Sequence, residues 1–348
     1  MLFNIEHDLG LEIIGYVVPD GFTGRSTIRV MRGGDELLVK QTDSQREALV
    51  RAGRHETGLC GFTISDSEIP GLAEIHDLEI RDSETDIIIY RRINPEAIVA
   101  QKIFRLETHL LPASRIDRAL QPRFQFYFPS IDRFGLETTH QMFLMNNTNS
   151  VYASGRVSYR GIESYLDQGY ASVAMIQEPF DELAERLLLL RLIGENRAGI
   201  LGLRDSVAFE AVKRFASGLP LETDKTLSRA FRDIDPEVAD MLTDPLVRQL
   251  TTRQPNEGLK PSSISQALTT LSAFRAVGLR NRAELFAETL VDALSLHTGE
   301  VPAVEPIPAA RELGARLREM PAVERLLEHD IAVFHFVSEA FEKSLIEG

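Results

Sequence analysis

The stretch Ala171-Ser-Val-Ala-Met-Ile-Gln177 is followed at once by Glu178-Pro179 and then by a long segment of helical character. An uninterrupted apolar run of this length is typical of a strand that is buried on both faces of a sheet. The same order occurs earlier, where the strand-like Gln101-Lys-Ile-Phe-Arg-Leu-Glu107 precedes the helical segment Pro112–Leu120. Two successive strand–turn–helix units predict an α/β domain built on a parallel sheet.

The first 95 residues have a different pattern, in which short strand-like segments alternate with turn signals. Ser26–Arg32, for example, leads into the glycine turn Gly33-Gly34. Several short strands at such spacing are typical of a β-sandwich. The sequence therefore predicts two domains, a β-sandwich accessory domain at 1–95 and an α/β domain at 98–348. Asn94-Pro95-Glu96 is the expected linker between them.

Beyond Glu195 the sequence predicts a half-domain made almost entirely of helices, because apolar residues recur there with the helical period. One predicted helix includes Val277, so that Val277-Gly278-Leu279 is interpreted as the end of a helix. The predicted helical segments are Ser206–Ala216, Lys225–Phe231, Pro236–Leu242, Ser263–Val277, Arg282–Ser295, Ala309–Met320 and Ala322–Leu345.

The composition restricts the class of protein. Of the 348 residues, 43% are hydrophobic and 26% are charged, which is typical of a globular chain with a large core. The formal net charge of −14 makes nonspecific binding to nucleic acid unfavourable. The single cysteine, Cys60, excludes a disulfide framework and a cysteine-based zinc site. The eight histidines show no metal-ligand spacing, so we expect no metal site.

The sequence contains no segment that predicts a membrane helix or a signal peptide. The first residues lack a basic region followed by an apolar one, and no uncharged apolar run reaches about 18 residues. We expect a cytoplasmic protein, with peripheral attachment at the inner membrane as the alternative.

The order of elements, taken with several short motifs, resembles a known enzyme family. The motifs are Ser154–Tyr159, Met175–Pro179, Asp244–Leu250 and Ala267–Leu279. Together they are similar to the bacterial and Golgi-type carbohydrate sulfotransferases, which use 3′-phosphoadenosine-5′-phosphosulfate (PAPS). The resemblance covers about residues 98 to 348. It implies a P-loop-like α/β fold, with a sulfotransferase-like parallel sheet and a helical C-terminal half.

The resemblance also assigns the loop that would bind the 5′-phosphosulfate of PAPS. The family sequence reads H-I-P-K-T-[AG]-G-[TS]-S, and here the stretch Leu106–Ser114 stands in its place. Only Ser114 matches. His109 stands at the position of the family lysine, and Glu107 brings a negative charge to a site for an anionic donor.

Two further family positions are also replaced. The 3′-phosphate motif R-D-P-x-x-R-x-x-S corresponds to a segment in which Gln177 replaces the first arginine and Glu185 replaces the serine. A carboxylate close to a phosphate is repulsive. Arg156 stands at the position of the family's catalytic histidine, and an arginine stays protonated and cannot act as a base. We expect Arg105 and Arg156 to bind an anionic substrate instead.

These replacements predict a sulfotransferase-like pseudoenzyme, a non-sulfating binding or scaffolding component in surface-polysaccharide synthesis or modification. The N-terminal module is similar to the β-rich accessory domains fused to bacterial glycosyltransferases. The expected partner is a glycan or a protein of the assembly system, and no bound cofactor is expected. Two alternatives stay open: an active PAPS-dependent carbohydrate sulfotransferase with an unusual donor site, and a transferase of the same fold with another anionic donor. The sequence leaves the oligomeric state open.

Overall fold

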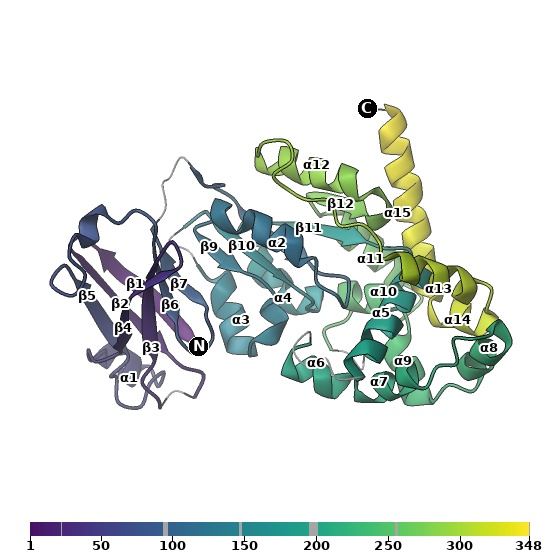
Figure 1. Ribbon diagram of the computed structural model, residues 1–348, viewed down its shortest axis with the longest axis horizontal. Helices are drawn as coiled ribbons and strands as arrows, with labels where there is room; N and C mark the ends of the chain where they lie inside the picture. The colour runs from purple at the N-terminus through teal and green to yellow at the C-terminus, as the bar shows by residue number, and fades with distance from the viewer. Residues whose placement is uncertain (22, 93–96, 146–147, 195–200, 255–256, 348) are drawn as a thin grey trace. The chain divides into compact units, whose positions relative to one another are not determined.

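The computed structural model describes residues 1–21, 23–92, 97–145, 148–194, 201–254 and 257–347 (Figure 1). It confirms a mixed α/β protein with a five-stranded parallel sheet, a helical C-terminal half and separate antiparallel sheets in the N-terminal part. The chain divides into two compact units, one of residues 1–102 with 120–153 and one of residues 103–119 with 154–348. The expected linker at 94–96 lies outside the described residues, and a domain boundary there stays a prediction.

In the N-terminal part, the described residues form two antiparallel sheets. In each sheet, strands alternate between buried and more exposed residues, so that each sheet has a face that belongs to the core; these strands are Glu12–Val18, Thr27–Arg32 and Leu78–Asp82. Gly33 and Gly34 have positive φ angles and allow the tight turn between the strands Thr27–Arg32 and Asp35–Gln41. The first sheet has the order β1 (Leu2–Asp8), β2 (Glu12–Val18), β5 (Gly61–Ser65) and the second β4 (Asp35–Gln41), β3 (Thr27–Arg32), β6 (Leu78–Asp82), β7 (Ile88–Arg91). A short helix, α1 (Glu47–Arg51), and a 3₁₀ turn (Leu72–Glu74) complete the region.

The parallel sheet has its first strand in the middle. Its order is β12 (Ala276–Leu279), β11 (Tyr170–Ile176), β8 (Lys102–Leu106), β10 (Val151–Gly155), β9 (Phe126–Phe128). From β8 the chain first builds β9 and β10 on one side, and then crosses to β11 and β12 on the other. The strand order therefore reverses between β8 and β11. In open α/β sheets, ligands bind at the carboxyl ends of the strands at such a point.

Helices connect and cover these strands. Those that follow β8, β9, β10 and β11 are α2 (Ser114–Leu120), α3 (Leu136–Phe143), α4 (Tyr159–Leu166) and α5 (Pro179–Gly194). The C-terminal half adds α6 (Leu203–Ala208), α7 (Glu210–Ser217), α8 (Asp224–Arg232), α9 (Pro236–Leu242), α10 (Pro245–Thr251), α11 (Ser263–Ser272), α12 (Ala283–Leu294), α13 (Pro308–Arg318), α14 (Pro321–Leu326) and α15 (Glu328–Glu347). In the described part of this region, 3₁₀ turns lie at Gln121–Arg123, Ile131–Arg133 and Arg280–Arg282. Among the described residues, no helix has both the length and the apolar character that crossing a membrane requires.

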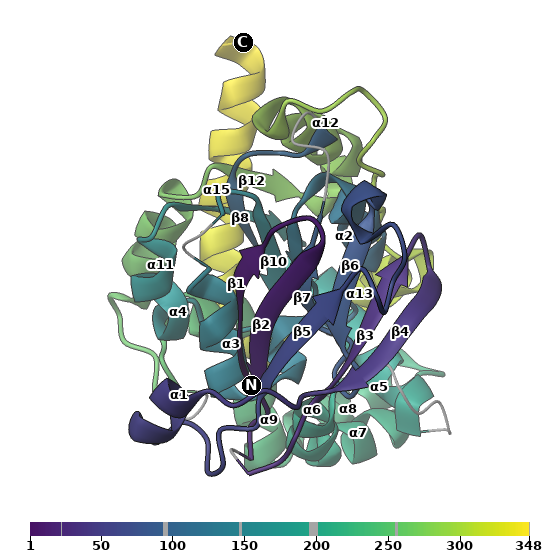
Figure 2. The ribbon, with the colours of Figure 1, turned by 90° about the vertical axis from the view of Figure 1, so that its left-hand side faces the viewer.

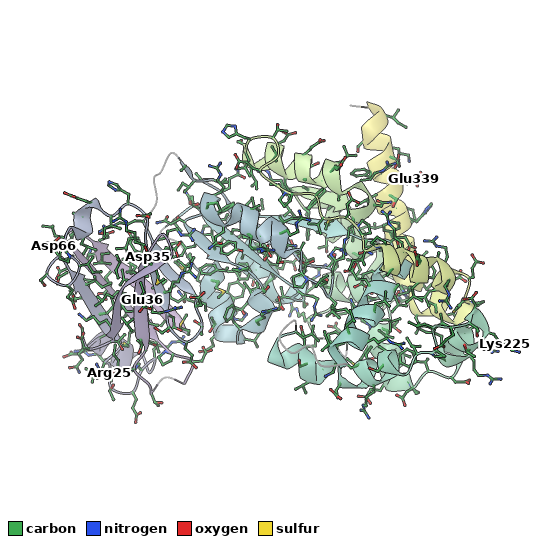
Figure 3. All side chains as sticks on the ribbon, viewed as in Figure 1. Arg25, Asp35, Glu36, Asp66, Lys225 and Glu339 are labelled. Atoms are coloured by element: carbon green, nitrogen blue, oxygen red, sulfur yellow. The ribbon has the colours of Figure 1, made fainter. Side chains whose placement is uncertain are left out.

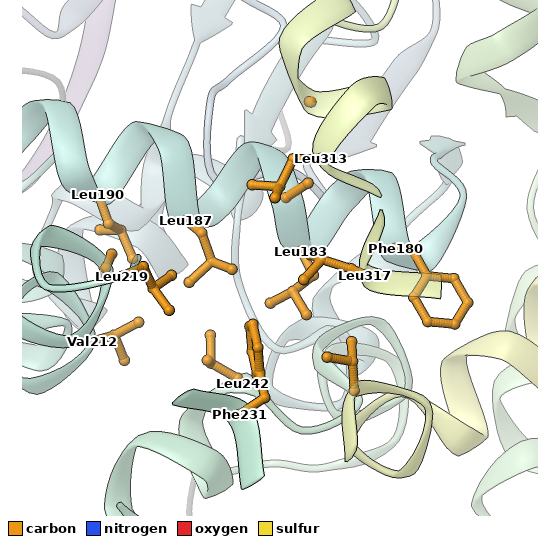
Figure 4. Packing of buried hydrophobic residues seen from close by; sticks show 14 of the residues in the cluster. Phe180, Leu183, Leu187, Leu190, Val212, Leu219, Phe231, Leu242, Leu313 and Leu317 are labelled. Atoms are coloured by element: carbon orange, nitrogen blue, oxygen red, sulfur yellow. The ribbon is translucent and has the colours of Figure 1, made fainter. Parts of the chain in front are cut away.

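The core of the helical half is built around α5. Leu183, Leu187 and Leu190 are spaced three and four residues apart, so they share one face of this helix. Figure 4 shows these side chains directed toward Leu242 and Phe231, which come from α9 and α8. The apolar residues that recur with the helical period in the sequence are thus buried by packing between helices.

One prediction for this half is wrong. The helix expected to reach Val277 ends at Ser272, and Ala276–Leu279 forms the edge strand β12. β12 runs parallel to β11, with Val173 opposite Ala276. Four residues are too few to show a strand period in the sequence, so long-range pairing decides the conformation. Two other predicted helices are each divided in two, into α6 with α7 and into α14 with α15.

Candidate functional site

The loop that follows β8 is held against its neighbours by side chains of the same unit. The Thr108 hydroxyl donates a hydrogen bond to the Met175 carbonyl of β11 at 2.7 Å. The Gln249 amide on α10 donates to the carbonyl of Glu107 at 2.8 Å and to that of Val157 at 3.2 Å. These contacts place the loop at the point where the strand order reverses.

The centre of this loop is the carboxylate of Glu107, which is 2% exposed. It accepts hydrogen bonds from Arg105 Nη1 at 2.8 Å and from the backbone N–H groups of Ala113 at 2.7 Å and His109 at 3.3 Å. His109 Nδ1 lies 3.0 Å from its Oε1. Burial alone would raise the pKa of Glu107, but Arg105 and His109 hold it well below its usual range. The loop therefore folds around the carboxylate of Glu107, which is one of its own residues.

Arg105 is also bound by a second carboxylate. Its Nη2 donates to Asp117 Oδ1 at 2.8 Å, and Asp117 is 2% exposed on α2. Expected as a substrate-binding residue, Arg105 is itself 2% exposed and lies between Glu107 and Asp117. A buried arginine held by two carboxylates has its charge compensated within the protein.

A second buried cluster lies at the carboxyl ends of β11 and β12. Arg280 Nη1 donates to Gln177 Oε1 at 2.6 Å and to the two oxygens of Glu185 at 2.9 and 2.8 Å. All three side chains are 3–5% exposed. The sequence interpretation missed Arg280, because the four-residue strand β12 directly before it is too short to show a strand period. Gln177 and Glu185, expected to line one phosphate site, do lie together, but both are bound to the side chain of Arg280.

Within the described residues, three buried nitrogen atoms of these two clusters have no hydrogen-bond partner. They are His109 Nε2, Gln177 Nε2 and Arg280 Nε. Each belongs to a residue placed after β8, β11 or β12, at the carboxyl end of a strand. A buried polar atom without a partner is costly, so these clusters compensate their charges more completely than their hydrogen-bonding groups.

The remaining expected site residues lie elsewhere. Arg156 forms an ion pair with Asp205 on α6, and its guanidinium carbon lies 5.3 Å from the centre of the Phe209 ring. Glu182, another carboxylate near the expected donor site, pairs with Arg186 at 2.8 Å. Ser114 is an exposed residue at the start of α2. The structure thus joins Arg105 with His109 through Glu107, and Gln177 with Glu185 through Arg280, in two separate networks.

The arrangement opposes the binding of an anionic donor at either cluster. A phosphate or sulfate at Arg280 would have to displace Glu185, and one at the β8 loop would have to displace Glu107. Within the described parts of the chain, no three His, Cys, Asp or Glu side chains gather as a metal site. Comparison of the sequence with models of known protein families and with curated proteins finds no match.

Proposed function

We propose that this chain is a sulfotransferase-like protein that does not sulfate and that serves as a binding or scaffolding component in surface-polysaccharide synthesis or modification. The observation that carries the proposal is the pairing of Arg280 with Glu185 and Gln177. Those two positions are where the family resemblance puts the 3′-phosphate of PAPS. A carboxylate already neutralises the available cation there, which opposes binding of a second anion.

The β8 loop supports the same proposal. Backbone N–H groups of a loop after a strand commonly hold phosphate, and here two of them donate to Glu107. An anionic donor would have to separate this carboxylate from Arg105 in a buried setting. The partner that we propose is a glycan or a protein of the assembly system, in the cytoplasm or at the inner membrane surface.

Calorimetry with adenosine 3′,5′-bisphosphate tests the proposal. The parent protein should show no binding in the micromolar range, and no sulfate transfer from PAPS to a surface polysaccharide. Glu185→Ser should gain affinity of at least about tenfold, because it leaves Arg280 and the Gln177 amide free to donate to phosphate. Gln177→Arg is not needed for the test, since a second cation beside Arg280 would repel the first.

The matched control is Glu182→Ser, which removes a carboxylate of the same helix from a different arginine, Arg186. It should leave nucleotide binding unchanged. Glu185→Ser should also melt at a lower temperature than the parent, and the nucleotide should restore part of that loss. Micromolar binding by the parent would overturn the proposal. If the two serine variants bound the nucleotide with equal affinity, the role assigned to the pairing of Glu185 with Arg280 would be contradicted.

A further inference from the structure

Two buried aspartates in the second unit cap each other's helices. The carboxylate of Asp330 accepts the backbone N–H groups of Leu246 at 3.0 Å and Val247 at 2.8 Å, which begin α10. Asp244, the residue before α10, accepts the N–H groups of His329 at 2.9 Å and Asp330 at 3.0 Å in the first turn of α15. Each carboxylate therefore satisfies donors that the start of the other helix leaves without partners.

The surroundings of Asp330 disfavour its negative charge. Its side chain is 3% exposed, and that of Asp244 is 2% exposed. Burial, and after it the charge of Asp244, raises the pKa of Asp330 to about 8, although the two backbone donors act in the opposite direction. A carboxyl group in this position keeps its proton near neutral pH.

Charged groups near this pair come from four helices, α5, α9, α10 and α15. Glu182 on α5 adds repulsion, and Arg186, one turn further along, is bound to it at 2.8 Å. His329 Nδ1 lies 2.8 Å from Asp244 Oδ2. Arg248 on α10 donates to Asp240 at 2.7 Å. The residues of α11, which packs against α15, include no ionisable side chain.

α10 also reaches the candidate site. Its residue Gln249 donates to the carbonyl groups of Glu107 in the β8 loop and of Val157 after β10. The capped start of α10 lies only three residues before Gln249. A change at the cap that moves α10 must therefore either carry the β8 loop with it or break these two hydrogen bonds.

We propose that Asp244 and Asp330 form a pH-sensitive latch, which holds α10 on α15 while Asp330 carries a proton and loosens the β8 loop when that proton passes to solvent. The driving force is the repulsion between two neighbouring buried carboxylates. In the open form Asp330 is solvated, so its pKa returns to the ordinary value of an aspartate and the group is ionised near neutral pH. Opening therefore becomes easier as the pH rises toward the pKa of the closed form, and levels off above it.

Hydrogen exchange measured by mass spectrometry between pH 6 and pH 9 tests this latch in the full-length protein. After correction for intrinsic exchange, amides of α10 should open about tenfold more often for each pH unit up to about pH 8, and then level off. The β8 loop, residues 107–113, should follow the same profile. In Asp330→Asn both segments should show no such pH dependence, because the amide side chain does not titrate.

Two control variants separate the parts of the proposal. Asp235→Asn alters the cap of α9, where Asp235 accepts the Glu237 N–H at 2.9 Å in an exposed position, and should keep the parent profile. Gln249→Ala should keep the pH dependence of α10 and abolish that of the loop. The latch is disproved if the parent and Asp330→Asn share one profile, and its coupling to the loop is disproved if only α10 responds.

Discussion

Glu107 illustrates how one side chain can take the place of a ligand. It gathers an arginine, a histidine and two backbone N–H groups, which are the groups that proteins use to hold oxyanions. In the sequence it appears only as an acidic residue in the loop that follows a strand-like segment. The structure adds that it is buried and that its partners all lie within the same short segment.

Glu107→Gln should therefore destabilise the protein by roughly 2–4 kcal/mol at pH 7, because it leaves part of a buried charge uncompensated. The pKa of Glu107 is lowered by its partners, so its contribution is present above the unfolded-state value and is lost as the pH falls. The difference in melting temperature between parent and variant should shrink below about pH 4.5. Thermal melts from pH 3 to pH 7 check this, with the exposed Glu84→Gln as the control that should change little.

Arg156 is a partly exposed residue with a defined partner. Its side chain is 19% exposed and that of Asp205 is 20% exposed. Arg156→Ala should lower the free energy of unfolding by about 1 kcal/mol, through the ion pair and the contact with Phe209. Asp205→Ala should have a similar effect, and the double variant should lose less than the sum of the two. Unchanged stability with lost binding to a surface-glycan array would instead assign Arg156 to a ligand.

At the scale of elements, β12 depends on a close approach to α12. A Cβ atom on Gly278 would lie 2.3 Å from a ring carbon of Phe286, so nothing larger than glycine fits without movement. Gly278 is also two residues before Arg280, and the strand therefore sets the position of that guanidinium. The position of the edge strand β12 therefore determines the position of the second buried cluster.

We expect Gly278→Ala to destabilise the protein by about 1–3 kcal/mol through overpacking. The change should also weaken the Arg280 cluster, because it shifts the strand that carries it. Urea unfolding measures the first effect, and hydrogen exchange of β12 the second. Gly258→Ala is the matched control, since a Cβ atom there meets nothing within 4 Å and the residue has no positive φ. Equal stability of the two alanine variants would contradict the prediction.

At the scale of the molecule, the N-terminal strands share a compact unit with residues 120–153. Arg91, which is 5% exposed, donates to the carbonyl groups of Gln121 at 2.8 Å and Phe124 at 2.9 Å. The Gln141 amide on α3 donates to the Phe3 carbonyl of β1 at 3.2 Å. A β-sandwich domain that ends at residue 95 would have to expose these contacts if it were isolated.

Limited proteolysis between residues 92 and 97 should therefore give two fragments that stay together. We expect them to co-elute in size-exclusion chromatography under native conditions and to separate in urea. The isolated fragment 1–95 should melt at a lower temperature than the cleaved complex, because Arg91 and β1 lose their partners. Fragments that separate without denaturant would support an independent N-terminal domain.

The sequence by itself determined the local features of this protein. The apolar run Ala171–Gln177 predicts a parallel sheet, the strand-like Ser26–Arg32 with its glycine turn predicts a β-rich region, and both are present. These patterns can be recognised in the sequence because the burial of a strand determines which of its successive residues are apolar. The acidic residues Glu107 and Glu185 are likewise visible in the sequence.

Only the tertiary structure decided what those residues bind. Arg280 lies 103 residues from Gln177 and 95 from Glu185, and its strand has too few residues to show a period. The partner of Arg156 is 49 residues away, and the two capping aspartates are separated by 86. Pairing over such distances depends on where the sheet and the helices place each side chain, and no local pattern of the sequence encodes it.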